Sequence, residues 1–99
     1  MEKRTIPDSL VVGGHDYTIK YEPRLLLKEN RYGVTEWHEQ TVSLEPVLSM
    51  DSLNQTFWHE VIHLIDRHYT NCSLSEDATD NLAEGLYQVM KQLGLVFSK

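Results

Sequence analysis

The first half of the chain alternates short apolar runs with polar residues, as β-strands do. Residues 9–21 (SLVVGGHDYTIKY) place a β-branched run before Gly13-Gly14, and aromatic and aliphatic residues then alternate with polar ones. A glycine pair between two such runs is a strong signal for a tight turn. The pattern therefore predicts a β-hairpin.

Two further segments continue this half. Residues 23–30 (PRLLLKEN) fit either another strand or a helical turn, because a short apolar run does not separate the two. Residues 31–46 (RYGVTEWHEQTVSLEP) read as two short strands, the second containing Val42 and Leu44 and ending at Pro46. We expect a sheet of three to four strands.

The second half changes to helical spacing. A first helix is predicted from Ser49 or Asp51, both residues that favour the N-cap. Its apolar positions are Leu53, Phe57, Val61, Leu64 and Ile65. After a break at residues 69–75, a second helix is expected from about Ser75 to Gly94, a residue suited to ending a helix. Its apolar residues fall on one stripe: Leu82, Leu86, Val89 and Leu93.

This order of elements predicts an α+β fold. Residues 1–99 are expected to form a single domain in which a small N-terminal antiparallel sheet precedes two packed helices. A chain of this length has one core, because it buries only somewhat more than ~60% of the surface exposed by its unfolded form.

Composition excludes several classes of function and location. The net charge of −6 argues against direct binding to nucleic acid, which usually needs a basic patch. The single cysteine, Cys72, rules out an intramolecular disulfide, and the N-terminus lacks the apolar stretch of a secretory signal. No apolar run is long enough to span a membrane. We therefore expect a cytoplasmic protein.

The motif H-E-x-x-H, formed by His59, Glu60 and His63, lies inside the first predicted helix. Residues four apart share one helix face, so both imidazoles can converge on one metal ion. Glu60 lies ~100° further round the helix. From there its carboxylate can hold a water molecule beside the ion and accept its proton. The pattern predicts a catalytic zinc site rather than two solvated histidines.

A catalytic zinc ion needs a third protein ligand and an open position. The second helix offers Glu76, Asp80 and Glu84, which lie on one face. Glu76 also fits a capping box with Ser73, and Glu84 fits a solvated surface charge. Simple hairpin geometry favours Asp80 over Glu76, because His63 lies well before the end of its helix. A pair such as Glu76 and Asp80 can also supply one ligand and one acceptor for a histidine N–H.

Taken together, these segments resemble the minimal gluzincin-type zinc peptidases. In particular, they resemble the small ImmA/IrrE-like metallopeptidases common in phages, prophages and mobile elements. The resemblance is carried, in order, by the glycine-turn hairpin VVGGHDYTIKY, the strand TVSLEP, the motif HEVIHLID and the helix SEDATDNLAEGLYQVM. In that family the ligand glutamate lies seven residues before the alanine of an apolar-alanine pair. Leu82-Ala83 is such a pair, and Glu76 falls at that position.

The resemblance implies a zincin-like fold, bound Zn²⁺ held by His59, His63 and Glu76, Glu60 as general base, and Asp80 beside a histidine. It also implies hydrolysis of a polypeptide that pairs with a strand edge beside the cleft, here Thr41–Leu44. The expected target is a repressor or another host or phage regulator. An alternative is a non-catalytic, zinc-stabilised binding or regulatory protein of phage or mobile-element origin. Such a site would be four-coordinate and would recruit His68 or Cys72.

Three other residues have two interpretations each. Asp66 shares the face of the two histidines and fits either a partner for a ligand or an exposed charge. Tyr69 and Tyr87 could donate to a developing oxyanion, although packing at a helix edge explains each of them better.

Overall fold

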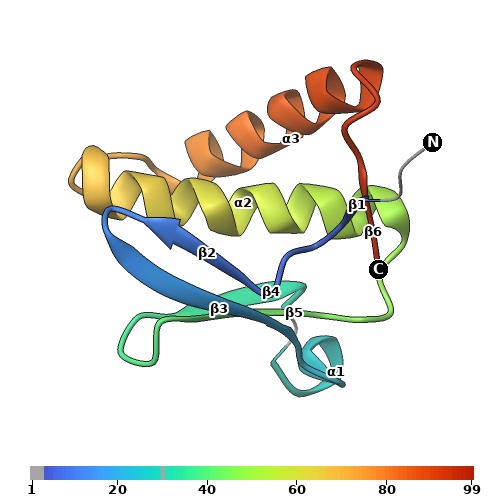
Figure 1. Ribbon diagram of the computed structural model, residues 1–99, viewed down its shortest axis with the longest axis horizontal. Helices are drawn as coiled ribbons and strands as arrows, with labels where there is room; N and C mark the ends of the chain where they lie inside the picture. The colour runs from blue at the N-terminus through green and yellow to red at the C-terminus, as the bar shows by residue number, and fades with distance from the viewer. Residues whose placement is uncertain (1–3, 30) are drawn as a thin grey trace.

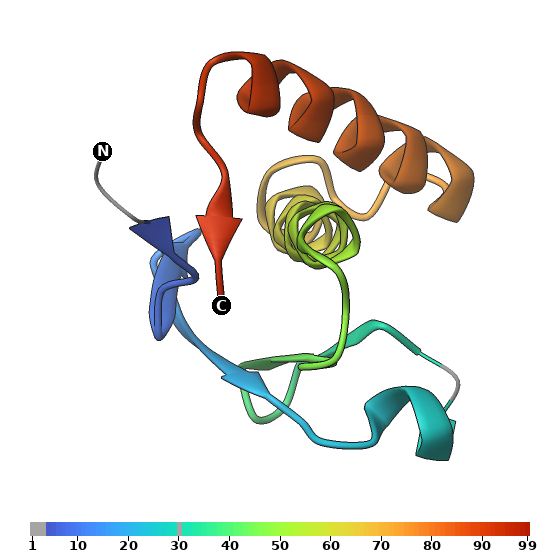
Figure 2. The same ribbon diagram turned by 90° about the vertical axis from the view of Figure 1, so that its right-hand side faces the viewer.

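The computed structural model describes residues 4–29 and 31–99, and it has the predicted α+β order of a sheet followed by two helices. A four-stranded sheet has the order β2-β3-β5-β4. Helix α2 (Met50–Tyr69) packs on this sheet, and α3 (Glu76–Gln92) lies on the far side of α2. The view along α2 in Figure 2 shows these three layers.

The predicted hairpin is present as β2 (Ser9–Val12) and β3 (His15–Tyr21), paired antiparallel. Gly13 and Gly14 both have positive φ, +60° and +78°, as the mirror-image turn of a two-residue hairpin requires. The ambiguous segment forms a short helix, α1 (Leu25–Glu29), with Leu25 buried; Asn30 lies outside the described residues.

The sheet is mixed rather than purely antiparallel. Strands β4 (Gly33–Glu36) and β5 (Thr41–Leu44) form the expected antiparallel pair, but β5 lies beside β3 and runs parallel to it. After β3, helix α1 carries the chain beyond the position beside β3, and β4 forms there as the outer strand. The chain then returns, and β5 fills the position between β3 and β4. The expectation that Thr41–Leu44 forms the open edge was therefore wrong, because β5 is an inner strand and β4 is the edge.

The core lies between the sheet and α2. Its ten buried members come from the strands, the connections before β2 and α2, and α2 itself: Ile6, Tyr17, Ile19, Val42, Leu44, Leu48, Leu53, Phe57, Val61 and Leu64. Of the two candidate N-caps, Ser49 is the one that begins α2, and its side chain accepts a hydrogen bond from the Ser52 N–H. One face of α2 is thus fixed against the sheet, and the face carrying the histidine pair is turned toward α3.

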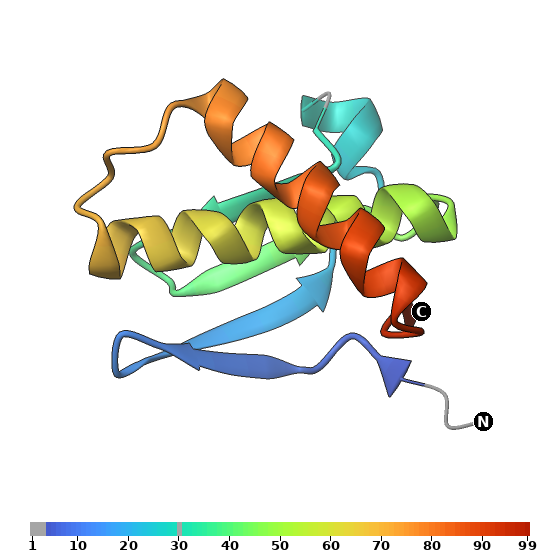
Figure 3. The ribbon, with the colours of Figure 1, turned by 90° about the horizontal axis from the view of Figure 1, so that it is seen from above.

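Helix α3 packs on α2 through a different face from its apolar stripe. Its buried residues are Thr79, Ala83 and Tyr87. The stripe of Leu82, Leu86, Val89 and Leu93 is instead between 36% and 65% exposed. Such a stripe ordinarily faces a core. Here the small side chains of Thr79 and Ala83 are the ones buried at the contact with α2. The view from above shows α3 crossing over α2 (Figure 3).

The first and last strands that the structure describes pair beside α2. Strand β1 (Arg4–Thr5) pairs in parallel with β6 (Phe97–Ser98). Asn54, fully buried on α2, donates to the Phe97 carbonyl and accepts from the Phe97 N–H, both at 2.9 Å. Gly94, with φ +76°, ends α3 as predicted and turns the chain toward β6. Within residues 4–29 and 31–99, no helix is both long and apolar enough to cross a bilayer.

Candidate metal centre

The two histidines of the motif converge on one point. His59 and His63 lie one turn apart on α2, and their Nε2 atoms are 3.0 Å from each other. A tetrahedral zinc ion bound at about 2.0–2.1 Å holds its ligand atoms about 3.3 Å apart. The spacing of the two nitrogens is therefore of the size that a shared metal ion requires.

Glu76 supplies a carboxylate at the same point. It is the first residue of α3, and its two oxygens lie 2.8 Å from Nε2 of His59 and 3.4 Å from Nε2 of His63. The alternative capping box with Ser73 is not formed, because Ser75 is the N-cap and accepts from the Ala78 N–H. Glu76 is therefore free of a capping role and directed at the histidines.

Asp80 lies one turn further along α3, on the other side of His59. Its Oδ1 is 3.0 Å from Nδ1 of His59. A proton on Nδ1 is donated to this carboxylate, and the lone pair of the ring then lies on Nε2, toward Glu76 and His63. This is the arrangement that usually orients a ligating imidazole. The geometry thus favours Glu76 as the third ligand and Asp80 as the residue that orients His59.

Simple hairpin geometry had favoured Asp80 over Glu76 as the third ligand. The contacts of Asp66 explain why the structure favours Glu76 instead. Asp66 is neither exposed nor in contact with the two histidines; it is buried at 5% exposure near the end of α2. Its carboxylate accepts from the Thr70 hydroxyl and from the N–H groups of Ser73 (3.0 Å) and Leu74 (3.3 Å). This folds the connection back along α2, so that α3 begins beside His59 and His63.

Glu60 lies next to this point but is held apart from it. Its carboxylate is buried at 5% exposure, and its Oε1 accepts a hydrogen bond of 2.8 Å from the Thr35 hydroxyl. Its Oε2 lies 4.0 Å from Nε2 of His59. Donor atoms of His59, Glu60 and His63 also lie within 4.8 Å of one another, so Glu60 is a conceivable ligand. Glu76 approaches the imidazoles more closely and has no such competing bond, which leaves Glu60 for another role.

The environment of Glu60 suits a proton acceptor. Removal of the carboxylate from water raises the pKa of Glu60 above its usual value. The hydrogen bond from Thr35 and the charges of His59 and His63 act in the opposite direction. A carboxyl group with a raised pKa is closer to the operating pH of most enzymes, where a general base works best.

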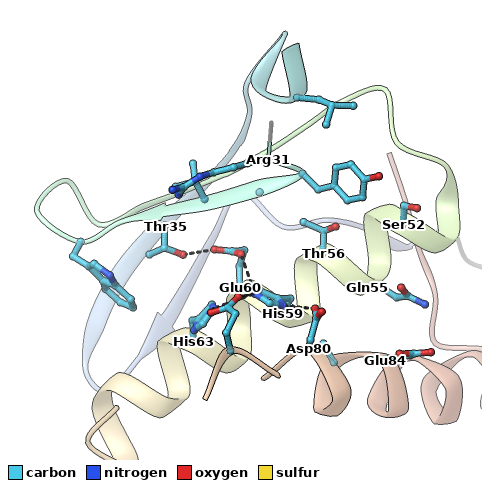
Figure 4. A pocket seen from close by; sticks show the side chains of 17 residues that line it. Arg31, Thr35, Ser52, Gln55, Thr56, His59, Glu60, His63, Asp80 and Glu84 are labelled. Atoms are coloured by element: carbon cyan, nitrogen blue, oxygen red, sulfur yellow. Dashed lines mark hydrogen bonds and ion pairs between the residues drawn. The ribbon is translucent and has the colours of Figure 1, made fainter. Parts of the chain in front are cut away.

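A cleft of about 880 Å³ opens onto these residues. Edge strand β4 forms one wall, α2 forms the floor, and the first turns of α3 form the other wall. Figure 4 shows Thr35 reaching from β4 to Glu60, with His59, His63 and Asp80 below it. The strand beside the cleft is therefore β4, whereas the sequence had indicated Thr41–Leu44.

Gly33 allows β4 to lie this close to α2. A Cβ atom at this position would be 2.7 Å from the Thr56 methyl group and 3.4 Å from Cγ of Glu60. Contacts under 3.0 Å force a shift of the backbone or the neighbour. Any side chain at Gly33 would therefore displace either β4 or the Thr56 side chain.

The remaining candidates lie elsewhere. Glu84 lines the outer part of the cleft without contacting the histidines. Tyr69 is 68% exposed, and Tyr87 donates its hydroxyl to Asp51, so neither faces Glu60. His68 is hydrogen-bonded to the Tyr17 hydroxyl, and Cys72 is exposed in the connection between the helices.

Sequence reasoning missed Thr35. A threonine in a short strand is ordinary, and its role depends on a contact with a residue 25 positions away in the chain. Alternation along β4 predicts that Gly33 and Thr35 share one face, but it does not identify what that face meets.

In the comparisons with known proteins, no protein-family model, curated protein or solved structure matches the chain.

Proposed function

We propose that this protein is a zinc-dependent peptidase in which His59, His63 and Glu76 hold Zn²⁺ and Glu60 is the general base. One observation carries the proposal. The imidazole nitrogens of His59 and His63 and the carboxylate of Glu76 meet at the bottom of an open cleft. The buried carboxylate of Glu60 lies beside them and accepts a hydrogen bond from Thr35. Three ligands with an open position are typical of catalytic zinc sites, and structural sites are closed by four protein ligands.

When bound, zinc would polarise the scissile carbonyl and lower the pKa of water at the site. The other tasks fall to the chain itself. Glu60 takes the proton from the attacking water and passes it to the nitrogen of the leaving amine. Asp80 holds His59 in the orientation that directs Nε2 toward the ion.

The position of β4 supports a polypeptide substrate. This strand is bonded to β5 on one side only, and its other side borders the cleft. An extended peptide can add to such an edge through main-chain hydrogen bonds. The expected target remains a regulatory protein, as the resemblance implies.

The alternative of a closed, non-catalytic zinc site requires a fourth protein ligand. His68 would have to leave the Tyr17 hydroxyl to serve as one. Among the residues that line the cleft, Glu60 is the remaining donor near both imidazoles. The two functions therefore differ in what Glu60 does.

The test compares wild type with Glu60→Gln, both loaded with zinc and incubated with a random-sequence peptide library that is then analysed by mass spectrometry. Both proteins are expected to hold one zinc ion per chain. The variant should cleave at least about 100-fold more slowly, because it lacks the proton acceptor. Glu39→Gln, which changes an exposed glutamate in the turn before β5, should leave the rate unchanged. Zinc binding without cleavage by wild type would contradict the peptidase and favour the regulatory protein.

A further inference from the structure

The backbone of β4 directs two residues toward the open edge. The Glu45 N–H donates to the Tyr32 carbonyl at 2.8 Å, so this pair is bonded across the β4–β5 ladder. Bonded and non-bonded pairs alternate along an antiparallel ladder. The next pair, Gly33 with Leu44, is therefore non-bonded.

The other side of β5 agrees with this assignment. The Leu44 carbonyl accepts from the Glu22 N–H at 2.9 Å, so it faces β3 rather than β4. Two positions further along β4, Thr35 opposite Val42 is again a non-bonded pair. Gly33 and Thr35 are thus the residues of β4 whose backbone N–H and carbonyl groups point away from β5, toward the cleft.

The same two residues contact α2. They share one face of the strand because side chains alternate with a period of two. Gly33 lies against Thr56 and Glu60, and the Thr35 hydroxyl bonds to Glu60. Thr35 therefore combines backbone groups available to a docked peptide with the side chain that holds the general base. Figure 4 shows this side chain directed at Glu60.

We propose that Thr35 is a positioning residue that couples docking of a peptide on β4 to the alignment of Glu60. The inference rests on the proposed peptidase function. By donating to Oε1, Thr35 leaves Oε2 as the oxygen that faces His59, where the attacking water must lie. A peptide paired with the Thr35 backbone forms hydrogen bonds along the free edge of β4. It thereby restricts the movement of this strand and of the Thr35 hydroxyl group.

In the reaction, Oε2 accepts the proton of the attacking water, and the Thr35 hydroxyl keeps its own proton while donating to Oε1. The proton then moves from Oε2 to the amine nitrogen as the C–N bond breaks. Thr35 acts through Glu60 in both steps and does not touch the reacting atoms. Removing the hydroxyl should therefore affect the rate of the bound complex more than the binding of the peptide.

The test measures kcat and KM for Thr35→Val and Thr35→Ser on an internally quenched peptide, taken from the best-cleaved member of the random library. Thr35→Val should lower kcat by about 10- to 100-fold, part of the effect of losing a general base, with KM changed less than about 3-fold. Thr35→Ser keeps the hydroxyl and should stay within about 3-fold of wild type. Thr18→Val, which changes an exposed strand threonine on β3, is the matched control.

Four further measurements separate positioning from a structural role. Zinc content and the thermal midpoint of each variant are measured, and Thr35→Ala replaces Thr35→Val if the latter does not fold. In a Glu60→Gln background, Thr35→Val should change the residual kcat less than about 2-fold, because residues that act through one another are not additive. The peptide Kd of zinc-loaded Glu60→Gln should be the same with and without Thr35→Val.

The outcomes are distinct. An active wild type with unchanged kcat in Thr35→Val and Thr35→Ala would overturn the role of Thr35 and leave the peptidase intact. A loss of kcat that persists in the Glu60→Gln background would also overturn it. A zinc-loaded wild type that cleaves nothing would overturn the peptidase proposal, and this inference with it.

Discussion

Helix α2 contributes to two histidine clusters that differ in chemistry. His59 and His63 point into the cleft, with their Nε2 atoms toward the carboxylate of Glu76. Near the end of α2, His68 stacks on His15 of β3, with ring centres 4.9 Å apart, and bonds to the Tyr17 hydroxyl. The first cluster is surrounded by carboxylates, and the second by aromatic rings and a glycine turn.

This comparison shows what separates a metal site from a packed histidine pair. An imidazole binds a cation well when its other nitrogen is oriented and anionic ligands are near. Asp80 and Glu76 provide both at His59. At His68 the Nε2 atom is already engaged by Tyr17, which is 2% exposed. We therefore expect the two clusters to respond differently to substitution.

The largest difference should be in zinc affinity. His63→Ala removes a ligand, and the zinc Kd should rise more than about 100-fold, beyond the usual effect of losing a supporting residue. His68→Ala should leave the Kd unchanged, because His68 does not reach the cleft. A competitive titration against a chelator measures both. Equal losses in the two variants would show that the clusters are not distinct.

A smaller effect is expected from the residue that orients His59. Asp80→Asn retains the shape but removes the charge beside Nδ1, and zinc affinity should fall by about 10- to 100-fold. Glu84→Gln changes the next carboxylate on the same face and should have little effect, since it contacts neither histidine. The same chelator titration applies. If Glu84→Gln were the more damaging change, general negative charge rather than orientation would explain the site.

Substitutions at the second cluster, around His68, should change the stability of the fold rather than zinc affinity. A Cβ atom at Gly13 would lie 2.4 Å from the His68 ring, and the residue has φ +60°. Gly13→Ala should therefore lower the free energy of unfolding by roughly 1–3 kcal/mol. In a His68→Gly background, which also removes the Cβ atom that would lie 2.6 Å away, the cost should fall toward the backbone strain alone, about 1 kcal/mol. Denaturant unfolding of the four proteins measures the coupling, and an additive result would contradict the contact.

The smallest effect concerns the seam between α2 and α3, which brings Glu76 to the histidines. Burial raises the pKa of Tyr87 to about 12 from 10.0, assisted by its hydrogen bond to Asp51. The folded state favours the neutral phenol, so this contribution to stability is complete below pH 10 and is lost as the pH rises toward 12. Tyr87→Phe should remove this part of the pH dependence.

The thermal midpoint measured from pH 9 to 12 tests this, with Tyr69→Phe as a control at a tyrosine that is 68% exposed. Identical pH profiles for wild type and Tyr87→Phe would show that the Tyr87–Asp51 contact does not stabilise the seam.

Local patterns predicted much of this structure. The glycine pair at 13–14, Ser49 as one of two candidate N-caps, the start of α3 near Ser75 and its end at Gly94 depend on neighbouring residues, and all are found where the sequence indicates. The shared face of His59 and His63 follows from helix geometry alone.

What the sequence did not predict depends on contacts between distant segments. The position of β4 at the edge follows from the parallel pairing of β3 with β5, which no local pattern encodes. The stripe of α3 is exposed because Thr79 and Ala83, rather than the larger leucines, fit against α2. Thr35 and Asp66 acquire their roles only when the chain is folded, through bonds to Glu60 and to the connection before α3.

The most direct test of the account is the zinc content of the untagged protein, by elemental analysis, for wild type beside Glu76→Ala. The account predicts one zinc ion per chain in wild type and a sharp reduction in the variant, because Glu76 is the third ligand. Full zinc in both proteins would move the third ligand to another residue. An absence of stoichiometric metal in wild type, even after zinc is added, would contradict the metal centre itself.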